Sequence, residues 1–233
     1  MKTSIKCALI LAVALVLTGS ILSYGIVKFK SMDRTVSVRG LCERDVQANK
    51  VTWPLTYKEI GNDPQQIYES IAAKNQAIIA FLKSGGVTDA EINVGSPMVS
   101  DRQADNYGNE ILNYRYVAKG VITVVSTDIE KVRKLLLRQS ELMRQGIALV
   151  SSEYDEHGVT YEFTDLNKIK PEMVEEATKN ARATAQKFAD DSGSSIGSVT
   201  SAQQGQFTIE DCDATTPYIK HVRVVTTLSY ALD

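Results

Sequence analysis

The sequence predicts an α+β protein in which mixed or antiparallel sheets carry three helices, preceded by an N-terminal transmembrane helix. Three observations predict this class. Segments that alternate apolar and polar side chains occur in pairs, and helical patterns that end in glycine separate the pairs. The resulting order is ββαββαββαββ, and paired strands between helices favour sheets with the helices on one side. An uncharged apolar run precedes all of these elements.

The apolar run extends from Cys7 to Val27, 21 residues with lysines on both sides. A helix of this length spans a hydrocarbon core of about 30 Å. Cleavable signal peptides have a shorter apolar region of about 7–15 residues before a small-residue cleavage site. We therefore expect residues 1–30 to be a signal anchor with a transmembrane helix over about 7–27, and residues 31–233 to be the exported domain. Cleavage of this segment is the alternative.

The first part of the exported domain contains two alternating segments, residues 34–42 and 51–59, followed by a helix. Gly40 suggests a bulge in the first strand. Pro54 suggests a bulge or an edge position in the second, because proline cannot donate to a ladder. The helix over 63–85 begins with an Asp-Pro capping pattern and ends in glycine.

The middle of the chain repeats this organisation. A strand over 91–99 precedes the longest alternating segment, residues 111–126. Its apolar face is expected to comprise Leu112, Tyr114, Tyr116, Ala118, Ile122 and Val124. Thr127 with Glu130 forms a capping-box pattern that predicts the start of the second helix, and Gly146 marks its end.

Two short strands are predicted over 147–154 and 159–164. The third helix follows them, beginning near Pro171 and ending at Gly193. Small side chains form its expected buried stripe, with a phenylalanine below them: Ala177, Ala181, Ala185 and Phe188. Strands over 195–209 and 220–231 close the chain. The similar helix-to-strand junctions suggest a duplicated helix-strand-strand unit.

Composition and charge exclude several function classes. The first 30 residues hold four lysines and no acid, so residues 31–233 carry 22 basic and 28 acidic side chains, a net charge of −6. This weakly acidic body argues against a nucleic-acid binder, which needs a basic face. With two histidines and three cysteines in the whole chain, we predict no metal, cofactor-binding or catalytic site.

The sharpest hint of an enzyme is the segment 193–197, which fits G-x-S-x-G around Ser195. Asp211, Asp213 and His221 follow it in the chain order of a hydrolase triad. The nucleophile elbow requires a strand, a strained turn and then a helix. Here a helix precedes the motif and a strand follows it, so we interpret the first glycine as a helix cap.

The histidines and cysteines could each have a chemical role, as a metal ligand or in a disulfide, or a purely structural one. His157 has acidic neighbours that resemble a metal cluster, but a predicted hairpin turn explains them as solvated turn residues. Cys42 and Cys212 could form a disulfide in an oxidising compartment, although we favour two free thiols, one buried and one in a loop. We interpret Cys7 as a membrane-facing apolar residue and His221 as a surface or pairing residue.

An aromatic surface is a further candidate, formed by Tyr57, Tyr107, Tyr114 and Tyr116. Alternation along the strand favours core or cross-strand pairs over ligand stacking. The polar loop 100–110 is the best candidate for a mobile contact segment, and a solvated hairpin loop is its alternative.

Taken in order, several short segments resemble the SIMPL-domain family. They are the entry to the first strand (36–40), the Phe-Leu helix end before a glycine (81–82), the alanine-rich helix (177–189), the QGQF segment (204–207) and the closing VRVVTT (222–227). The resemblance covers about residues 34–231. It implies a bacterial envelope protein, periplasmic or membrane-associated, with ring-forming relatives, a link to stress tolerance and no agreed enzymatic activity.

We therefore expect a non-enzymatic envelope protein that acts by oligomerisation or protein interaction. It would sit in the bacterial inner membrane as a single-pass protein, with its C-terminal domain in the periplasm and as a homo-oligomer. Secretion to the periplasm after cleavage is the alternative location. An envelope enzyme or small-ligand-binding protein with an unrecognised pocket is the alternative function. The protein partner, if one exists, is not indicated by the sequence.

Overall fold

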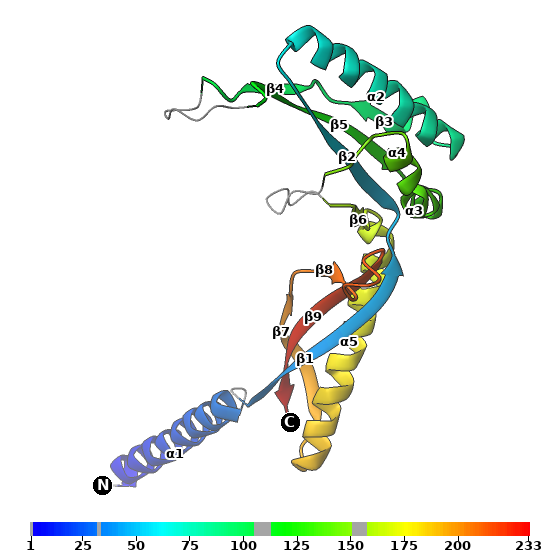
Figure 1. Cartoon of the computed structure of the whole chain (residues 1–233). Coiled ribbons are helices and arrows are strands. Elements are labelled where there is room, and N and C mark those ends of the chain that lie inside the picture. Colours follow the sequence, from blue (N-terminus) through cyan, green and yellow to red (C-terminus); the bar gives the residue numbers. More distant parts are fainter. Residues whose placement is uncertain (1, 32–33, 105–112, 151–157) are drawn as a thin grey trace. The chain divides into compact units, whose positions relative to one another are not determined.

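The computed structural model describes residues 2–31, 34–104, 113–150 and 158–233 (Figure 1). The elements in chain order are α1 (Lys2–Ser31), β1 (Thr35–Gln47), β2 (Lys50–Gly61), α2 (Pro64–Ser84), the 3-10 helix η1 (Asp89–Glu91), β3 (Ile92–Val94), β4 (Met98–Asp101), β5 (Tyr116–Ser126), α3 (Ile129–Arg138), α4 (Ser140–Arg144), β6 (Thr160–Glu162), α5 (Leu166–Asp191), β7 (Ile196–Gln204), β8 (Thr208–Asp211) and β9 (Ile219–Leu232).

The contacts within the chain group into two units. Unit 1 comprises Met1–Arg44, Asn167–Thr208 and Val222–Asp233, and unit 2 comprises Asp45–Leu166 and Ile209–His221. The expectation of one exported domain over 31–233 stays a prediction. Among the residues that the structure describes, we find no helix with both the length and the apolar character required to span a membrane.

The α+β class with antiparallel sheets is confirmed, but the helix number is wrong. In the described part of the chain, four α-helices rather than three follow α1, because the expected second helix divides at Gln139 into α3 and α4. There the Gln139 N–H turns to the Leu136 carbonyl, three residues back, at 3.3 Å, which ends the α-helical ladder. The N-cap is Asp128 rather than Thr127, and its carboxylate accepts from the Lys131 N–H at 3.0 Å.

Helix α5 also differs from its prediction. It begins at Leu166, so Pro171 lies inside it rather than at its start. A proline this near the start removes a single ladder hydrogen bond, and its fixed φ is itself helical. The small buried stripe is confirmed, since Ala177, Ala181 and Ala185 are each 0% exposed. Met173 and Ala189 extend it and are also 0% exposed. Phe188 does not lie below the stripe, since it is 58% exposed.

Unit 2 is built on a sheet with the order β3-β5-β2-β6, to which β4 adds along β5. Strands β2 and β5 pair without interruption from Val51↔Ser126 to Gly61↔Tyr116. The predicted strand over 91–99 is divided, because β3 ends before Gly95 and Pro97 and β4 begins after them. Of the predicted strand 147–154, Leu149 forms a bridge with Tyr57, and residues 151–154 lie outside the described part.

The core of unit 2 forms between one face of this sheet and helices α2, α3 and α4 (Figure 1). Its largest fully buried side chains come from both layers: Leu55, Tyr57, Ile78, Leu82, Ile122, Leu135 and Leu142. Every second residue of β5 from Ala118 to Ser126 is buried. The sequence pattern therefore predicted the buried positions Ala118, Ile122 and Val124 correctly, whereas Tyr114 of the predicted face precedes β5 and is 47% exposed.

Pro54 occupies an edge position, as the sequence suggested. Strand β6 pairs with β2 only at residues 50–52. The Thr56 carbonyl accepts from Val150 on the same side of β2. Because backbone groups two residues apart point the same way, the missing N–H of Pro54 lies on this side, beyond β6. The ladder with β5 therefore loses nothing.

Unit 1 contains most of the sheet β1-β9-β7, and helix α5 lies against it. Strand β8, which pairs along β9, belongs to unit 2 except for Thr208. Gly40 is not a bulge, because buried and exposed residues alternate through it without a break. Instead it permits close contact with α5. A Cβ added at Gly40 would lie 1.9 Å from the Ala177 carbonyl oxygen and 2.8 Å from the Ala181 Cβ. The absent side chain is thus what allows β1 and α5 to touch.

Candidate functional site

The outer edge of the unit 1 sheet is strand β7, which pairs with β9 in the described part of the chain. Residues Ser201–Gln204 are in regular register with β9, and the Gly205 N–H donates to the Val225 carbonyl at 2.8 Å. Since backbone groups alternate in direction along a strand, those of Ala202 and Gln204 point away from β9. The last seven residues of β7 are exposed. This edge can accept another strand.

The opposite edge of the same sheet is protected. In β1, the Leu41 carbonyl accepts from the Asn180 side chain of α5 at 2.9 Å. The strand also carries Arg39 and Glu43, and charges of this kind discourage edge pairing. By contrast, no charged residue occurs from Ser192 to Thr208, a range that contains the whole of β7. Of the two edges, β7 is therefore the one available for a partner.

A groove lies beside β7 because α5 leaves part of the sheet uncovered. Val199 is paired with Tyr230, yet it remains 50% exposed. The groove of about 640 Å³ is bounded by Thr178 and Arg182 of α5 and by residues of β7 and β9. Among the described residues, the hydroxyl of Thr226 on its floor is buried without a hydrogen-bond partner. The groove is mainly apolar with one cation at its rim.

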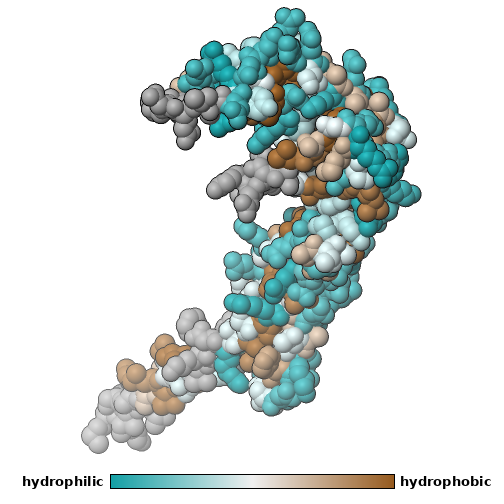
Figure 2. Space-filling model, viewed as in Figure 1, coloured by the Kyte–Doolittle hydropathy of each residue, from teal (hydrophilic) through white to brown (hydrophobic). Residues whose placement is uncertain are grey.

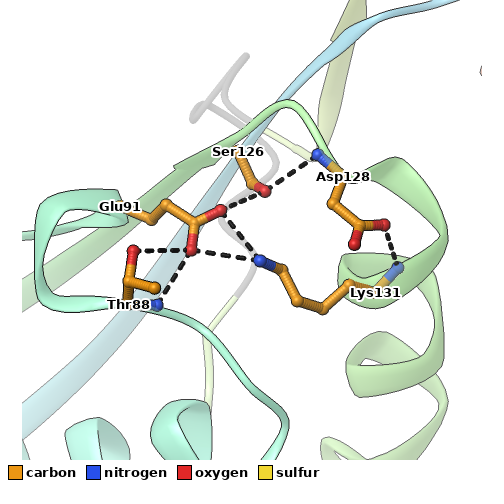
Figure 3. Close-up of polar contacts among 5 residues, drawn as sticks. All are labelled: Thr88, Glu91, Ser126, Asp128 and Lys131. Atoms are coloured by element: carbon orange, nitrogen blue, oxygen red, sulfur yellow. Dashed lines mark hydrogen bonds and ion pairs between the residues drawn. The ribbon is translucent and has the colours of Figure 1, made fainter.

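A dense polar cluster lies in unit 2 around Glu91 (Figure 3). The Thr88 N–H and hydroxyl donate to its carboxylate at 2.8 and 2.9 Å. The Ser126 hydroxyl donates to the other oxygen, and the Lys131 ammonium contacts both oxygens at 3.0 and 3.1 Å. These partners come from the turn before η1, the end of β5 and the first turn of α3.

The environment of Glu91 decides its protonation state. Burial alone raises the pKa of the carboxyl, but the hydrogen bonds from Ser126, Thr88 and Lys131 outweigh it and lower the pKa to about 2. A carboxylate this stable in its ionised form, with both oxygens occupied, is a poor general base. The cluster therefore fastens η1 and α3 to the end of β5.

Comparison with known families gives a match over most of the chain. Residues 36–223 match the SIMPL family, which is described as a protein of unknown function (DUF541). The chain belongs to the SIMPL family. The match covers most of the chain and includes segments of both units. No curated protein matches the sequence.

The triad suggested for this SIMPL chain is not assembled within either unit. Ser195 follows the end of α5, and its backbone exchanges two hydrogen bonds with Asp233 at 3.1 and 3.0 Å. Gly193 has a φ of 67°, which confirms it as the glycine at the helix end. Asp211 pairs with Lys220, and His221 Nδ1 lies 2.7 Å from Asp45 Oδ1, all within unit 2. The pairing expected for His221 is confirmed.

The second acid of that set, Asp213, organises a turn. Its carboxylate accepts from the backbone N–H groups of Thr215 and Thr216 at 2.7 and 2.8 Å. Hydrogen bonds from both threonines lower its pKa to about 2. Its acceptors are thus used within the turn before β9.

The cysteine prediction is confirmed in the form of two free thiols, Cys42 buried and Cys212 exposed after β8. The Cys42 thiol donates to Glu176 at 3.2 Å. Burial, with Glu176 beside it, raises the pKa of this thiol to about 11. It is therefore a poor nucleophile. The side chain of Cys7 lies outside the described part of the structure.

The tyrosines do not form one surface. Tyr57 lies in the core of unit 2, where its hydroxyl donates to Asn75 at 2.7 Å, and burial raises its pKa to about 12. Tyr116 is half-buried under the Arg115 guanidinium, whereas Tyr114 is 47% exposed. Tyr107 and most of the loop 100–110 lie outside the described residues, as does Leu112.

His157 also lies outside the described residues, so the choice between a metal ligand and a turn residue stays open. In the described ranges no group of three or more histidine, cysteine, aspartate and glutamate side chains could hold a metal ion. The absence of catalytic and cofactor sites stays a prediction. The only sequence signal for the β7 edge and its groove is the long uncharged stretch from Ser192 to Thr208.

Proposed function

We propose that this SIMPL protein is a membrane-anchored protein of the bacterial envelope. Its domain would work in the periplasm by association with further copies or with another protein, without catalysis. A contribution to envelope stress tolerance is the physiological role that we propose with it. The observation that carries the interaction is the uncharged, unprotected edge of β7, because an exposed edge is a template for another strand.

The anchor is supported by the 21 uncharged residues from Cys7 to Val27. The visible face of the described part of α1 carries hydrophobic residues (Figure 2). Its exposed large apolar side chains include Leu11, Val13, Leu15, Val16, Leu17, Ile21, Leu22 and Ile26. A helix that is apolar on every face requires an apolar surrounding. A bilayer would supply it.

Fractionation of the full chain from a bacterial host tests the anchor. We expect the protein in carbonate-washed membranes with the intact mass of all 233 residues. A protease added to the periplasmic side should digest the domain. A mature chain that begins near residues 21–26 and occurs in the soluble envelope fraction would overturn anchoring.

Cross-linking in the same membranes with a lysine-reactive reagent tests association. We expect dimers or larger species that become more abundant with salt, because the net charge of −6 on residues 31–233 opposes close contact and is screened over about 8–10 Å. A monomeric chain at all salt concentrations, with no cross-linked partner, would overturn the interaction function. Labelling with a fluorophosphonate should leave Ser195 unmodified, and a stoichiometric adduct there would contradict the non-enzymatic proposal.

A second candidate, a small-ligand-binding protein, is favoured by the groove beside β7. Arg182 at its rim has no ion pair within the described residues, and Thr226 on its floor has an unused hydroxyl. An organic anion with an apolar body would suit these groups. Titration with octanoate, with octanol as the control, should detect specific binding that Arg182→Gln abolishes. Equal responses to both compounds would exclude this function.

A further inference from the structure

We propose that β7 pairs with β7 of a second copy of this chain, antiparallel and across a two-fold axis at Gln203. This inference rests on the self-association proposed above and assigns its interface. It requires that backbone groups of β7 are free on the outer side, that the strand is complementary to itself, and that its side chains tolerate their own copies.

The backbone directions define the register. The groups of Ala202 and Gln204 point away from β9, since the Gly205 N–H, one residue on, donates to Val225. In an antiparallel pair centred on Gln203, Ala202 of one copy lies opposite Gln204 of the other. Each such pair exchanges two N–H···O bonds, and the axis generates the second pair. Four backbone groups of each copy would thus become satisfied.

The side chains at the axis suit a pairing of identical strands. Gln203 would face Gln203 of the second copy in a non-hydrogen-bonded position, where Cα atoms are about 4.5 Å apart. An amide both donates and accepts, so two glutamines can hydrogen-bond to each other. Across a two-fold axis, a charged side chain near the axis would lie close to the same charge of the second copy and repel it. The first charged residues on either side of Gln203 are Asp191 and Glu210, so β7 contains no such charge.

The length of the regular segment sets the strength of the interface. The register of β7 shifts on both sides of Val199. Next to it, the Thr200 hydroxyl donates a hydrogen bond to the Ser229 carbonyl at 3.1 Å. Such irregularities prevent pairing, so the contact is confined to Ser201–Gly205. A contact this short is weak in dilute solution. Anchoring would raise its effective concentration in the membrane.

Disulfide cross-linking of the full chain in native membranes tests the register. The background carries Cys7→Ser and Cys212→Ser and keeps the buried Cys42. Gln203→Cys should form a dimer under mild oxidation, because the expected Cα separation suits a disulfide. Thr227→Cys is the matched control, since it lies opposite Gln203 on β9, one strand further from the axis, and should stay monomeric. Ala202→Pro should abolish the cross-link, because it removes only an outward N–H.

A charge-swap experiment keeps the test independent of the folding of Ala202→Pro. Gln203→Lys and Gln203→Glu, each with two different affinity tags, should lose self-association alone and regain it when co-expressed. Lysine-reactive cross-linking of the wild-type chain separates the two levels of proposal. Oligomers without a Gln203→Cys dimer, or equal dimer formation by Thr227→Cys, would overturn the β7 interface only. Absence of any oligomer would overturn the self-association as well.

Discussion

Replacing Gly40 by alanine should separate β1 from α5. The added Cβ would lie 1.9 Å from the Ala177 carbonyl oxygen and 2.5 Å from the Ala181 amide nitrogen. Both are backbone atoms, so no side chain can rotate to make room. Ordinary contact begins at 3.4 Å, so α5 must withdraw by about 1.5 Å, which would forfeit about half or more of the attraction across the layer. We expect a loss of about 3 kcal/mol in unfolding free energy, the upper end for overpacking.

Two measurements on the full chain check this prediction. The melting temperature should fall by about 6–12 °C for a protein of this size. Cys42 lies two residues from Gly40 on the same face of β1 and is 2% exposed, so its thiol should react faster with a maleimide. Gly158→Ala is the control, because nothing lies within 4 Å of its added Cβ. Unchanged melting and unchanged Cys42 reactivity in Gly40→Ala would refute the close contact.

Three further outcomes are expected. Tyr57→Phe should cost about 1–3 kcal/mol in denaturant unfolding, because the partly buried Asn75 loses its donor; no change would show that water replaces it. Glu91 has a folded pKa of about 2 against an ordinary 4.5, so its stabilisation is complete above 4.5 and is lost as pH falls toward 2. Unfolding curves of Glu91→Gln should lack this acid dependence, and an identical dependence would contradict the assignment. In a Cys7→Ser variant, mass spectrometry should find Cys212 labelled in the native protein and Cys42 only after unfolding; early labelling of Cys42 would contradict its burial.

Local patterns predicted the elements in which each face of a strand or helix contacts one kind of surroundings, either the core or solvent. The alternation of β5 predicted its buried positions Ala118, Ile122 and Val124, because the period of two is imposed by the strand itself. The alanine stripe of α5 was predicted in the same way. Predictions failed where local signals compete. Pro171 has the pattern of a helix start, but α5 already begins at Leu166. The N-cap of α3 is Asp128 rather than its neighbour Thr127.

The roles of the chemical motifs depended on contacts that spacing does not encode. Ser195 has a hydrolase pattern around it, but it lies after a helix and bonds to the backbone of Asp233. Glu91 belongs to no motif, and its low pKa arises from donors that folding brings from Ser126 and Lys131. Such clusters are invisible in sequence because their members are 35 and 40 residues from the glutamate.

The sequence by itself determined the family, the α+β class and the apolar N-terminal run, because each follows from the composition and the periodicity of residues along the chain. The tertiary structure decided which glycine is a contact and which strand edge is open. Gly40 is identified by the backbone atoms of α5 across from it. The β7 edge is identified by what β9 leaves unpaired. Both are properties of atoms far apart in the chain, and only the folded backbone brings those atoms together.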